Sequence, residues 1–254
     1  MSRVLLETRD LTVRVGGHVA VDSVSCAFRS GELTAIVGPN GAGKTTYFNL
    51  ISGQIPAASG RVALDGRDIT RASVSQRTAL GIGRAFQLTN LFPNLSVLEN
   101  VRLVMQARSK TGFRLLTMAA SLHDLTEQAE AVLARVRLLD RAGQTVSALS
   151  HGDQRKLEVA LLIALDPLVY MFDEPTAGMS VDEAPVVLDL IADLKAQTDR
   201  TILLVEHKMD VIRSLADRII VLHNGALAAD GPPAEVMASA VVQEAYMGKD
   251  LADV

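Results

Sequence analysis

The spacing of hydrophobic and polar residues divides the chain into a strand-rich beginning, a helical middle and an end in which strands and helices alternate. Residues 4–28 alternate between apolar and polar positions and turn at Gly16-Gly17, as antiparallel strands do. Between Ser96 and Leu139 the apolar residues recur with the period of a helix. One face of the predicted helix holds Leu125, Ala129, Val132, Leu133, Val136 and Leu139. We therefore expect a β-rich start and a helical insertion over residues 88–148.

The last third of the chain alternates between short apolar runs and helical stretches. The runs of strand length are Leu168–Phe172, Ile202–Val205 and Ile219–Leu222, and the helical stretches are 181–197 and 207–216. A similar apolar run, Leu33–Val37, precedes a glycine-rich loop and a predicted helix over Gly43–Ser52. Apolar strands joined by helices are typical of a parallel sheet covered by helices. The predicted fold class is α/β, with a mostly parallel core sheet, an N-terminal antiparallel β subdomain and an α-helical subdomain.

The composition is that of an ordinary globular protein, with 254 residues, 48% hydrophobic residues and a net charge of −4. The acidic balance argues against a broad nucleic-acid-binding face, so we expect no nucleic-acid partner. The longest apolar run, Val159–Leu165, is far shorter than the roughly 20 residues that span a bilayer. The N-terminus lacks the apolar core of a signal peptide, which predicts a cytoplasmic chain. Cys26 lies at an apolar position of a strand and is expected to be a packed thiol.

The glycine-rich loop matches the phosphate-binding pattern G-x-x-x-x-G-K-[ST] in full, from Gly38 to Thr45. Glycines let consecutive backbone N–H groups close around phosphate oxygens, Lys44 supplies positive charge to the β- and γ-phosphates, and the Thr45 hydroxyl reaches Mg²⁺. The N-terminus of the following helix adds partial positive charge at the same place. The sequence therefore predicts a nucleotide site. The expected binding residues in this loop are Gly38, Asn40, Gly41, Ala42, Gly43, Lys44, Thr45 and Thr46.

Two adjacent carboxylates follow the apolar run Leu168–Phe172. Asp173 and Glu174 therefore lie at the carboxyl end of a strand, where α/β sheets bind ligands. We expect Asp173 to hold Mg²⁺, directly or through a water molecule. Glu174 can then orient or deprotonate the attacking water. Alone, the pair would be read as an exposed strand end, but together with the phosphate-binding loop it predicts hydrolysis of a nucleotide.

The segment Leu149-Ser150-His151-Gly152-Asp153-Gln154-Arg155 is the most specific feature of the chain. Ser150 is a good helix N-cap, Gly152 leaves room for a phosphate, and the predicted helix Asp153–Leu165 begins there. The segment is similar to the signature sequence, usually Leu-Ser-Gly-Gly-Gln, of the ATP-binding subunits of ATP-binding-cassette (ABC) transporters, and the chain resembles this family over nearly its whole length. The resemblance implies that the signature closes on the ATP held by a second ABC ATPase subunit in a head-to-tail dimer.

The resemblance implies roles for further residues. Gln87 is similar to the glutamine that reaches Mg²⁺ and water and senses the membrane partner, and His207 is similar to the switch histidine that contacts the γ-phosphate. Val15 stands where the family usually places an aromatic ring on the adenine. The expected catalytic residues are therefore Glu174, His207 and Gln87. The expected Mg²⁺ ligands are Thr45, Gln87 and Asp173, and Val15, Ser150 and Gly152 complete the ATP site.

Three positions depart from the family pattern. His151 replaces the first glycine of the signature, so the backbone contact there requires a side chain that points away. Asp153 replaces the usual glutamine or glutamate. Ser180 replaces the aspartate that usually ends the loop after Glu174, and we expect this change to weaken communication across the dimer.

The resemblance implies a single ABC ATPase domain of the P-loop NTPase class over residues 1–254. Residues 1–87 and 168–254 are expected to form a RecA-like core with the β subdomain. Residues 88–167 are expected to form the helical subdomain that carries the signature, and residues 232–254 a C-terminal helical tail.

Some segments resemble the ATPases of branched-chain or hydrophobic amino acid importers. They are Gly83–Gln87, Leu91–Val101, Ala177–Met179 and Glu244–Gly248. The resemblance implies an ATP-hydrolysing subunit on the inner face of the cell membrane. Its partners would be a paralogue or second copy of the chain, transmembrane permease subunits and, indirectly, a periplasmic solute-binding protein. Urea and other small polar solutes stay open as substrates.

Other nucleotide-hydrolysing proteins are alternatives. A soluble or export-linked ABC ATPase, such as an iron–sulfur cluster assembly ATPase, has similar motifs, but the importer-like segments speak against it. A DNA-maintenance ATPase would need a long heptad-bearing insertion between the loop and the signature, which is missing. A small-molecule kinase is disfavoured by the signature and by His207.

Overall fold

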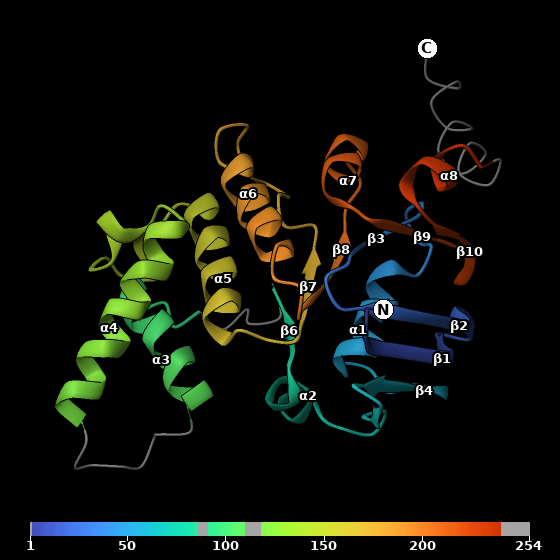
Figure 1. The fold of residues 1–254 in the computed structure, drawn as a ribbon, viewed down its shortest axis with the longest axis horizontal. Coiled ribbons are helices and arrows are strands. Elements are labelled where there is room, and N and C mark those ends of the chain that lie inside the picture. The colour runs from blue at the N-terminus through green and yellow to red at the C-terminus, as the bar shows by residue number, and fades with distance from the viewer. Residues whose placement is uncertain (1, 86–90, 110–117, 240–254) are drawn as a thin grey trace. The chain divides into compact units, whose positions relative to one another are not determined.

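The computed structural model describes residues 2–85, 91–109 and 118–239, and the chain forms two compact units (Figure 1). Unit 1 consists of Met1–Ile82, Leu168–Glu174 and Lys195–Val254, and unit 2 consists of Gly83–Pro167 and Pro175–Leu194. Both units are therefore assembled from segments that are distant in the sequence.

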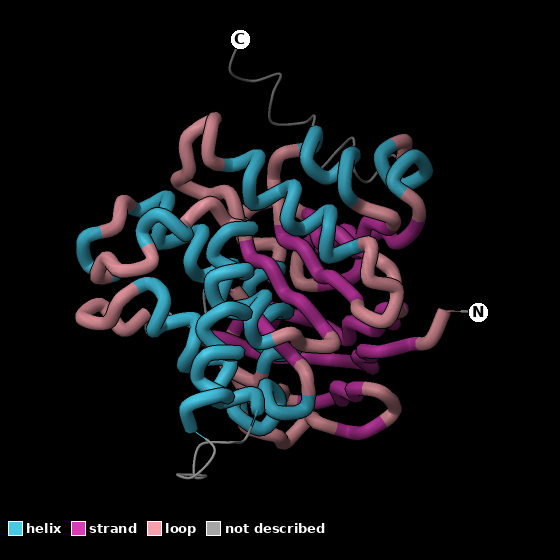
Figure 2. The backbone as a smooth tube through the Cα atoms, turned by 60° about the vertical axis from the view of Figure 1, so that its left-hand side comes forward, coloured by secondary structure: helices cyan, strands magenta, loops and turns pink. Residues whose placement is uncertain are grey.

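A six-stranded sheet has the order β10-β9-β3-β8-β7-β6, and all of its strands except β6 lie in unit 1. Figure 2 draws the strands in magenta. The strands of this sheet are β3 (Leu33–Val37), β6 (Ile82–Arg84), β7 (Val169–Asp173), β8 (Thr201–Val205), β9 (Arg218–His223) and β10 (Ala226–Gly231). Strands β7, β8, β3 and β9 run parallel, and β10 pairs antiparallel with β9. Every residue of β3 and β8 is buried, as their continuous apolar runs predict. The predicted α/β class is confirmed.

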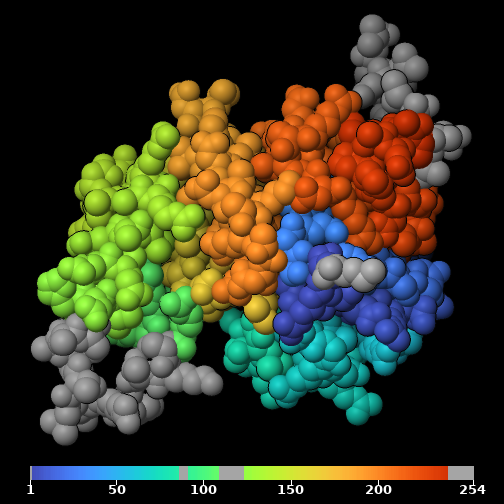
Figure 3. Space-filling view, in the orientation of Figure 1, coloured from blue at the N-terminus to red at the C-terminus, as the bar shows by residue number. Residues whose placement is uncertain are grey.

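A second, antiparallel sheet of unit 1 has the order β2-β1-β4-β5. Its strands are β1 (Val4–Val15), β2 (His18–Arg29), β4 (Ser59–Leu64) and β5 (Arg67–Asp68). Strands β1 and β2 form the predicted hairpin, and Figure 3 shows the blue N-terminal strands in contact with the cyan segment that contains β4. The register shifts along the β1–β2 pair, near the left-handed residues Asp10 and Ser23. Such bulges increase the local twist of a hairpin.

Helix α1 (Lys44–Ser52) packs its apolar side into the core that the strands of unit 1 form. Tyr47 and Phe48 are fully buried there, and the Tyr47 hydroxyl lies 2.7 Å from Thr8 Oγ1. Cys26 is a free, buried thiol in the same core, and its burial raises its pKa to about 11. A thiol with so high a pKa holds its proton at neutral pH and is unreactive. The prediction of a packed cysteine is confirmed.

The remaining helices of unit 1 are short: α2 (Val74–Leu80), α7 (Met209–Leu215) and α8 (Pro233–Met237). Helix α2 begins with a capping box in which Ser73 and Gln76 satisfy each other's backbone N–H groups. It ends at Gly81, whose left-handed backbone closes the last turn.

Unit 2 is helical. Its helices are α3 (Val97–Ser109), α4 (Met118–Arg135), α5 (His151–Leu165) and α6 (Ala184–Lys195), with 3₁₀ turns at Leu139–Arg141 and Val146–Ala148. Helices α3, α4 and α5 pack against one another (Figure 1). Ala129, Leu133 and Val136 are buried as predicted, but Leu139 is 45% exposed. The prediction for Leu139 was wrong because α4 ends at Arg135, so the helical period does not continue to that residue.

None of the helices in the described part of the chain has both the length and the apolarity that a bilayer-spanning segment requires.

Arg77 of α2 holds the carboxyl end of α1. Its guanidinium donates to the carbonyl oxygens of Leu50 and Ile51 at 2.6 Å each, to Thr70 O at 2.7 Å and to Ala72 O at 3.1 Å. The residue is 3% exposed, and burial lowers its pKa. A cation at this position also opposes the partial negative charge at the end of α1.

Replacing Arg77 with methionine should lower the free energy of unfolding by about 3 kcal/mol, because buried carbonyl groups of α1 and of the loop before α2 lose their donors. Urea denaturation followed by circular dichroism measures this loss. Arg71→Met, which changes an exposed arginine nearby, is the control and should change stability by less than about 0.5 kcal/mol. Equal effects of the two substitutions would contradict a special role for Arg77.

Candidate functional site

The glycine-rich loop between β3 and α1 borders a cavity of about 210 Å³ in unit 1. Most of the residues predicted for the nucleotide site line this cavity. The lining residues are Ala20, Asn40, Gly41, Ala42, Gly43, Lys44, Thr45, Thr46, Glu174 and His207. Four separate segments of the chain, from β2, from the loop, from the end of β7 and from the end of β8, thus meet at one place.

Two glycines of the loop are required by close contacts with neighbouring backbone. At Gly38, with φ of 151°, a Cβ atom would lie 2.1 Å from Leu222 O of β9. At Gly43, with φ of 98°, a Cβ atom would lie 2.4 Å from Ala20 O of β2. Any side chain at either position would push the loop off its supporting strands. The glycines therefore fix the loop in place as well as leaving room for phosphate.

The side chain of Lys44 folds back onto the glycine-rich loop that precedes it. Its Nζ donates to Gly38 O at 2.6 Å and to Pro39 O at 3.0 Å, and the residue is 6% exposed. Burial lowers the pKa of Lys44, while the carboxylates of Glu174 and Asp173 act in the opposite direction. The loop thus holds a desolvated cation near two acidic side chains, where it can attract an anion strongly.

Glu174 and His207 meet at the edge of the cavity. Glu174 Oε1 lies 2.7 Å from His207 Nε2. Glu174 directly follows β7 and has a φ of 51°, which is uncommon for a residue with a side chain, and its N–H donates to Val205 O at 2.9 Å. The backbone N–H of His207 donates to Glu206 Oε2 at 2.7 Å. The ends of two parallel strands therefore bring together two residues predicted to act on the γ-phosphate and the attacking water.

Two of the oxygen donors predicted for Mg²⁺ lie at the end of β7 and in the first turn of α1. Asp173 is the last residue of β7 and pairs in register with Val205 of β8. Thr45 is exposed in the first turn of α1, next to Lys44. A carboxylate and a hydroxyl are hard ligands of the kind that Mg²⁺ prefers, so the donor set fits this ion. Gln87, the third predicted ligand and a predicted catalytic residue, lies outside the described residues.

The signature segment starts α5 in unit 2. Ser150 is the N-cap, as predicted, and its Oγ accepts from the Asp153 N–H at 3.1 Å. The helix begins at His151 instead of the predicted Asp153, because the cap precedes it directly. The exposed His151 ring lies against the loop at Gly178, 3.7 Å from where a Cβ of that glycine would be.

Asp153 is buried and paired with two cations. It is 5% exposed, accepts from Lys156 Nζ and Ser150 Oγ at 3.0 Å each, and forms an ion pair with Arg141. Burial alone would raise the pKa of Asp153, but the hydrogen bonds from Lys156 and Ser150 and the charges of both cations lower it overall. The acid that replaces the usual glutamine is therefore an ionised carboxylate that ties the first turn of α5 to its surroundings.

Sequence reasoning missed parts of the site. Val15 is 56% exposed and does not line the cavity, whereas Ala20 of the next strand does. Gly225, in the turn between β9 and β10, donates its N–H to Ala42 O at 3.1 Å and accepts from Asp22 N at 2.8 Å. The dipeptide Asn224-Gly225 is a recognisable hairpin signal, but no local pattern indicates that this turn supports the loop.

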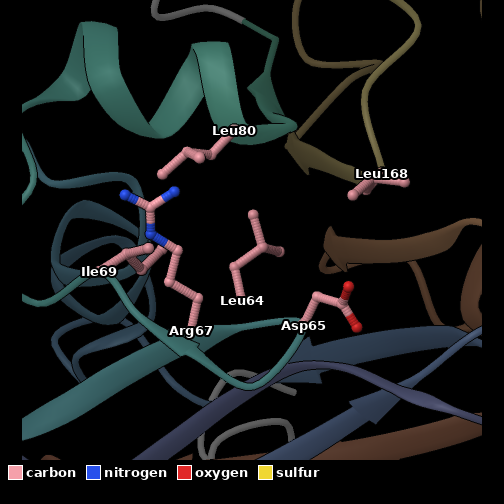
Figure 4. A pocket seen from close by; sticks show the side chains of 6 residues that line it. All are labelled: Leu64, Asp65, Arg67, Ile69, Leu80 and Leu168. Atoms are coloured by element: carbon pink, nitrogen blue, oxygen red, sulfur yellow. The ribbon is translucent and has the colours of Figure 1, made fainter.

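A second cavity of unit 1, of about 170 Å³, is mostly apolar. Figure 4 shows Leu64, Leu80 and Leu168 pointing toward one another, while the Asp65 carboxylate points away from Arg67. Leu168 directly precedes β7, so this cavity lies at the amino end of the strand, opposite Asp173 and Glu174. It shares no residue with the phosphate-loop cavity.

Comparison with known sequences places these motifs in a family. The profile of the ABC transporter family matches residues 21–177, and that of branched-chain amino acid ATP-binding cassette transporters matches residues 227–252. The chain belongs to the ABC transporter family. It is a nucleotide-binding, ATP-hydrolysing subunit of such a transporter, and the soluble ATPase alternative is not favoured.

Similar proteins cover the whole chain. The high-affinity branched-chain amino acid transport ATP-binding protein LivG of Salmonella typhimurium is 36% identical over 98% of this chain and 100% of its own length. BraF of Pseudomonas aeruginosa, with the same description, is 34% identical with the same coverage. Among solved structures, the ADP conformation of the ABC cassette MJ1267 has a TM-score of 0.80 at 28% identity, covering 98% of this chain and 100% of that one. A nucleotide-free cassette gives 0.80 at 27% identity, with 97% and 100% coverage.

Proposed function

We propose that the chain hydrolyses ATP for an importer of branched-chain or other hydrophobic amino acids. The observation that carries this proposal is the full-length similarity to LivG and BraF, because both are described as branched-chain amino acid transport proteins. The match of residues 227–252 to the branched-chain profile supports it independently of the motifs shared by all ABC ATPases.

In this proposal the phosphates of ATP lie in the loop from Gly38 to Thr46, beside Lys44. Thr45 and Asp173, together with Gln87, would hold Mg²⁺, which offsets negative charge on the phosphates when it is bound. Glu174 takes a proton from the attacking water. His207 contacts the γ-phosphate, and its Nε2, 2.7 Å from Glu174 Oε1, orients this carboxylate.

The second half of the site belongs to a second ATPase subunit, either another copy or a paralogue. Ser150 and Gly152 of one subunit close on the ATP bound by the other, in a head-to-tail dimer, and Val15 borders the adenine. The RecA-like core with the β subdomain spans residues 1–87 and 168–254, the helical subdomain spans 88–167, and the C-terminal tail spans 232–254. The dimer works on the inner face of the membrane with transmembrane permease subunits and, through them, a periplasmic solute-binding protein.

Reconstitution into liposomes tests the proposal. The chain would be combined with any permease and solute-binding subunits that are encoded beside its gene, and phosphate release would be measured with each candidate solute. Leucine, isoleucine and valine should stimulate ATP hydrolysis several-fold, whereas urea and glycine should not. Stimulation by urea alone would reject amino acids as the transported solutes, and failure of the chain to assemble with any membrane subunit would reject the importer assignment.

A further inference from the structure

A carboxylate of unit 2 lies directly over the signature glycine. A Cβ atom placed on Gly152 would be 2.3 Å from Glu183 Oε1 and 2.4 Å from Glu183 Oε2. Real Cβ atoms essentially never come this close to another heavy atom, so the Glu183 carboxylate takes up the space that any side chain at this position would need. The Cβ side of Gly152 is therefore covered by an anionic group of the same chain.

Glu183 is held in this position by the loop that precedes α6. Its Oε2 accepts from the Ser180 backbone N–H at 3.1 Å and from Ser180 Oγ at 3.0 Å. These two bonds lower the pKa of Glu183, and the bond from the backbone N–H has the larger effect. The positive charge of Lys156 lowers this pKa as well. The side chain is therefore an ionised carboxylate at neutral pH. Ser180, which replaces the family's aspartate, supplies both donors.

Two carboxylates, those of Asp153 and Glu183, lie close to the positively charged Lys156 near the start of α5. Lys156 Nζ lies 3.0 Å from Asp153 Oδ1 and 3.9 Å from Glu183 Oε1. The partial positive charge of the helix N-terminus acts on the same two carboxylates. A phosphate oxygen that approached the N–H of Gly152 would come close to the Glu183 carboxylate, and the two negative charges would repel each other.

We propose that Glu183 opposes the binding of ATP at the signature: its carboxylate lies on the Cβ side of Gly152, so the phosphate of the second subunit's ATP must approach against a negative charge. This inference rests on the proposed function, because the phosphate is supplied by the ATP of the second subunit. Because the Glu183 carboxylate repels the phosphate, closure of the dimer requires a higher concentration of ATP. Glu183 therefore raises the ATP concentration at which the transporter reaches half of its maximal rate.

A simpler role for Glu183 is helix capping. Ser180 and Glu183 have the spacing of a capping box, in which the acid reaches back to the N–H of the serine. Capping accounts for the bonds to Ser180 but requires no contact with Gly152. Glutamine also serves in a capping box, so Glu183→Gln keeps the cap and removes the charge. The two roles therefore predict different results for this variant.

The test uses the assembled transporter in liposomes. Glu183→Gln should lower the ATP concentration for half-maximal hydrolysis about tenfold with little change in kcat, because only the repelling charge is lost. Nucleotide affinity of the isolated subunit, measured by fluorescence titration, should not change. Asp182→Asn removes a neighbouring, exposed carboxylate and is the matched control, with no expected shift.

An unchanged or raised half-saturating ATP concentration in an active transporter would overturn the proposal and leave capping as the role of Glu183. Glu183→Ala separates the roles further, because it removes both cap and charge: repulsion predicts a lower half-saturating concentration despite a lower melting temperature. If the unmodified chain assembles into no active transporter, the proposed function itself fails, and the repulsive role of Glu183 is rejected with it.

Discussion

Replacing Glu174 with glutamine is expected to leave ATP bound while slowing its hydrolysis by a factor of at least about 10². An amide of the same shape cannot take a proton from the attacking water. It can still accept from the His207 ring at the position where Glu174 Oε1 now lies, 2.7 Å from Nε2. The phosphate loop and Lys44 are untouched, so affinity should persist. Single-turnover hydrolysis and equilibrium nucleotide titration measure the two quantities separately.

The control for this experiment is Asp210→Asn. Asp210 is an exposed acid in the first turn of α7, close to His207 in sequence but not among the residues lining the cavity. Its replacement should leave the rate unchanged. Near-normal turnover by Glu174→Gln would reject Glu174 as the general base, and a comparable loss in both variants would point to a nonspecific effect of charge.

Lys44→Ala should weaken nucleotide binding by at least about 100-fold, since it removes a desolvated cation from the phosphate position. The loss has a second cause, because Gly38 O and Pro39 O lose their donor and the loop relaxes. Isothermal titration with ATP and Mg²⁺ measures the change. Lys44→Met, which keeps most of the apolar stem, should bind as weakly while preserving more of the packing.

The matched control is Lys208→Ala, which removes an exposed lysine just before α7. Its affinity for ATP should stay within about twofold of the unmodified chain, because an exposed charge outside the site is screened by solvent and salt. Melting curves for all variants show whether weak binding reflects an unfolded protein. Retained affinity in a folded Lys44→Ala variant would contradict the assignment of the loop.

Features specified by adjacent residues were predictable. The loop residues share one short motif, and strand β3 is readable because both its faces are apolar. Ser150 as the N-cap of α5 follows from its side chain and its place before the helix. In each case the residues that determine the structure are close together in the sequence, so their pattern contains the information.

Features produced by distant segments were not predictable. Ala20 and Gly225 support the loop through backbone contacts, and the sequence does not indicate which distant backbone segment will meet the glycines of the loop. The pattern at Ser180 and Glu183 indicates a cap, but only the packing of the loop before α6 on the start of α5 shows that the carboxylate covers Gly152. The exposure of Leu139 depended on where α4 ends, which the apolar period alone does not reveal.

Glu174 is also one of the two residues at which the chain leaves unit 1, because Pro175 already belongs to unit 2. Its φ of 51° and the proline ring that follows leave this junction few alternative backbone conformations. The backbone conformation of Glu174 therefore influences both the position from which its side chain extends and the direction in which the chain enters Pro175. A mutation that relaxes this backbone would therefore disturb the Glu174 side chain and the start of the following loop at the same time.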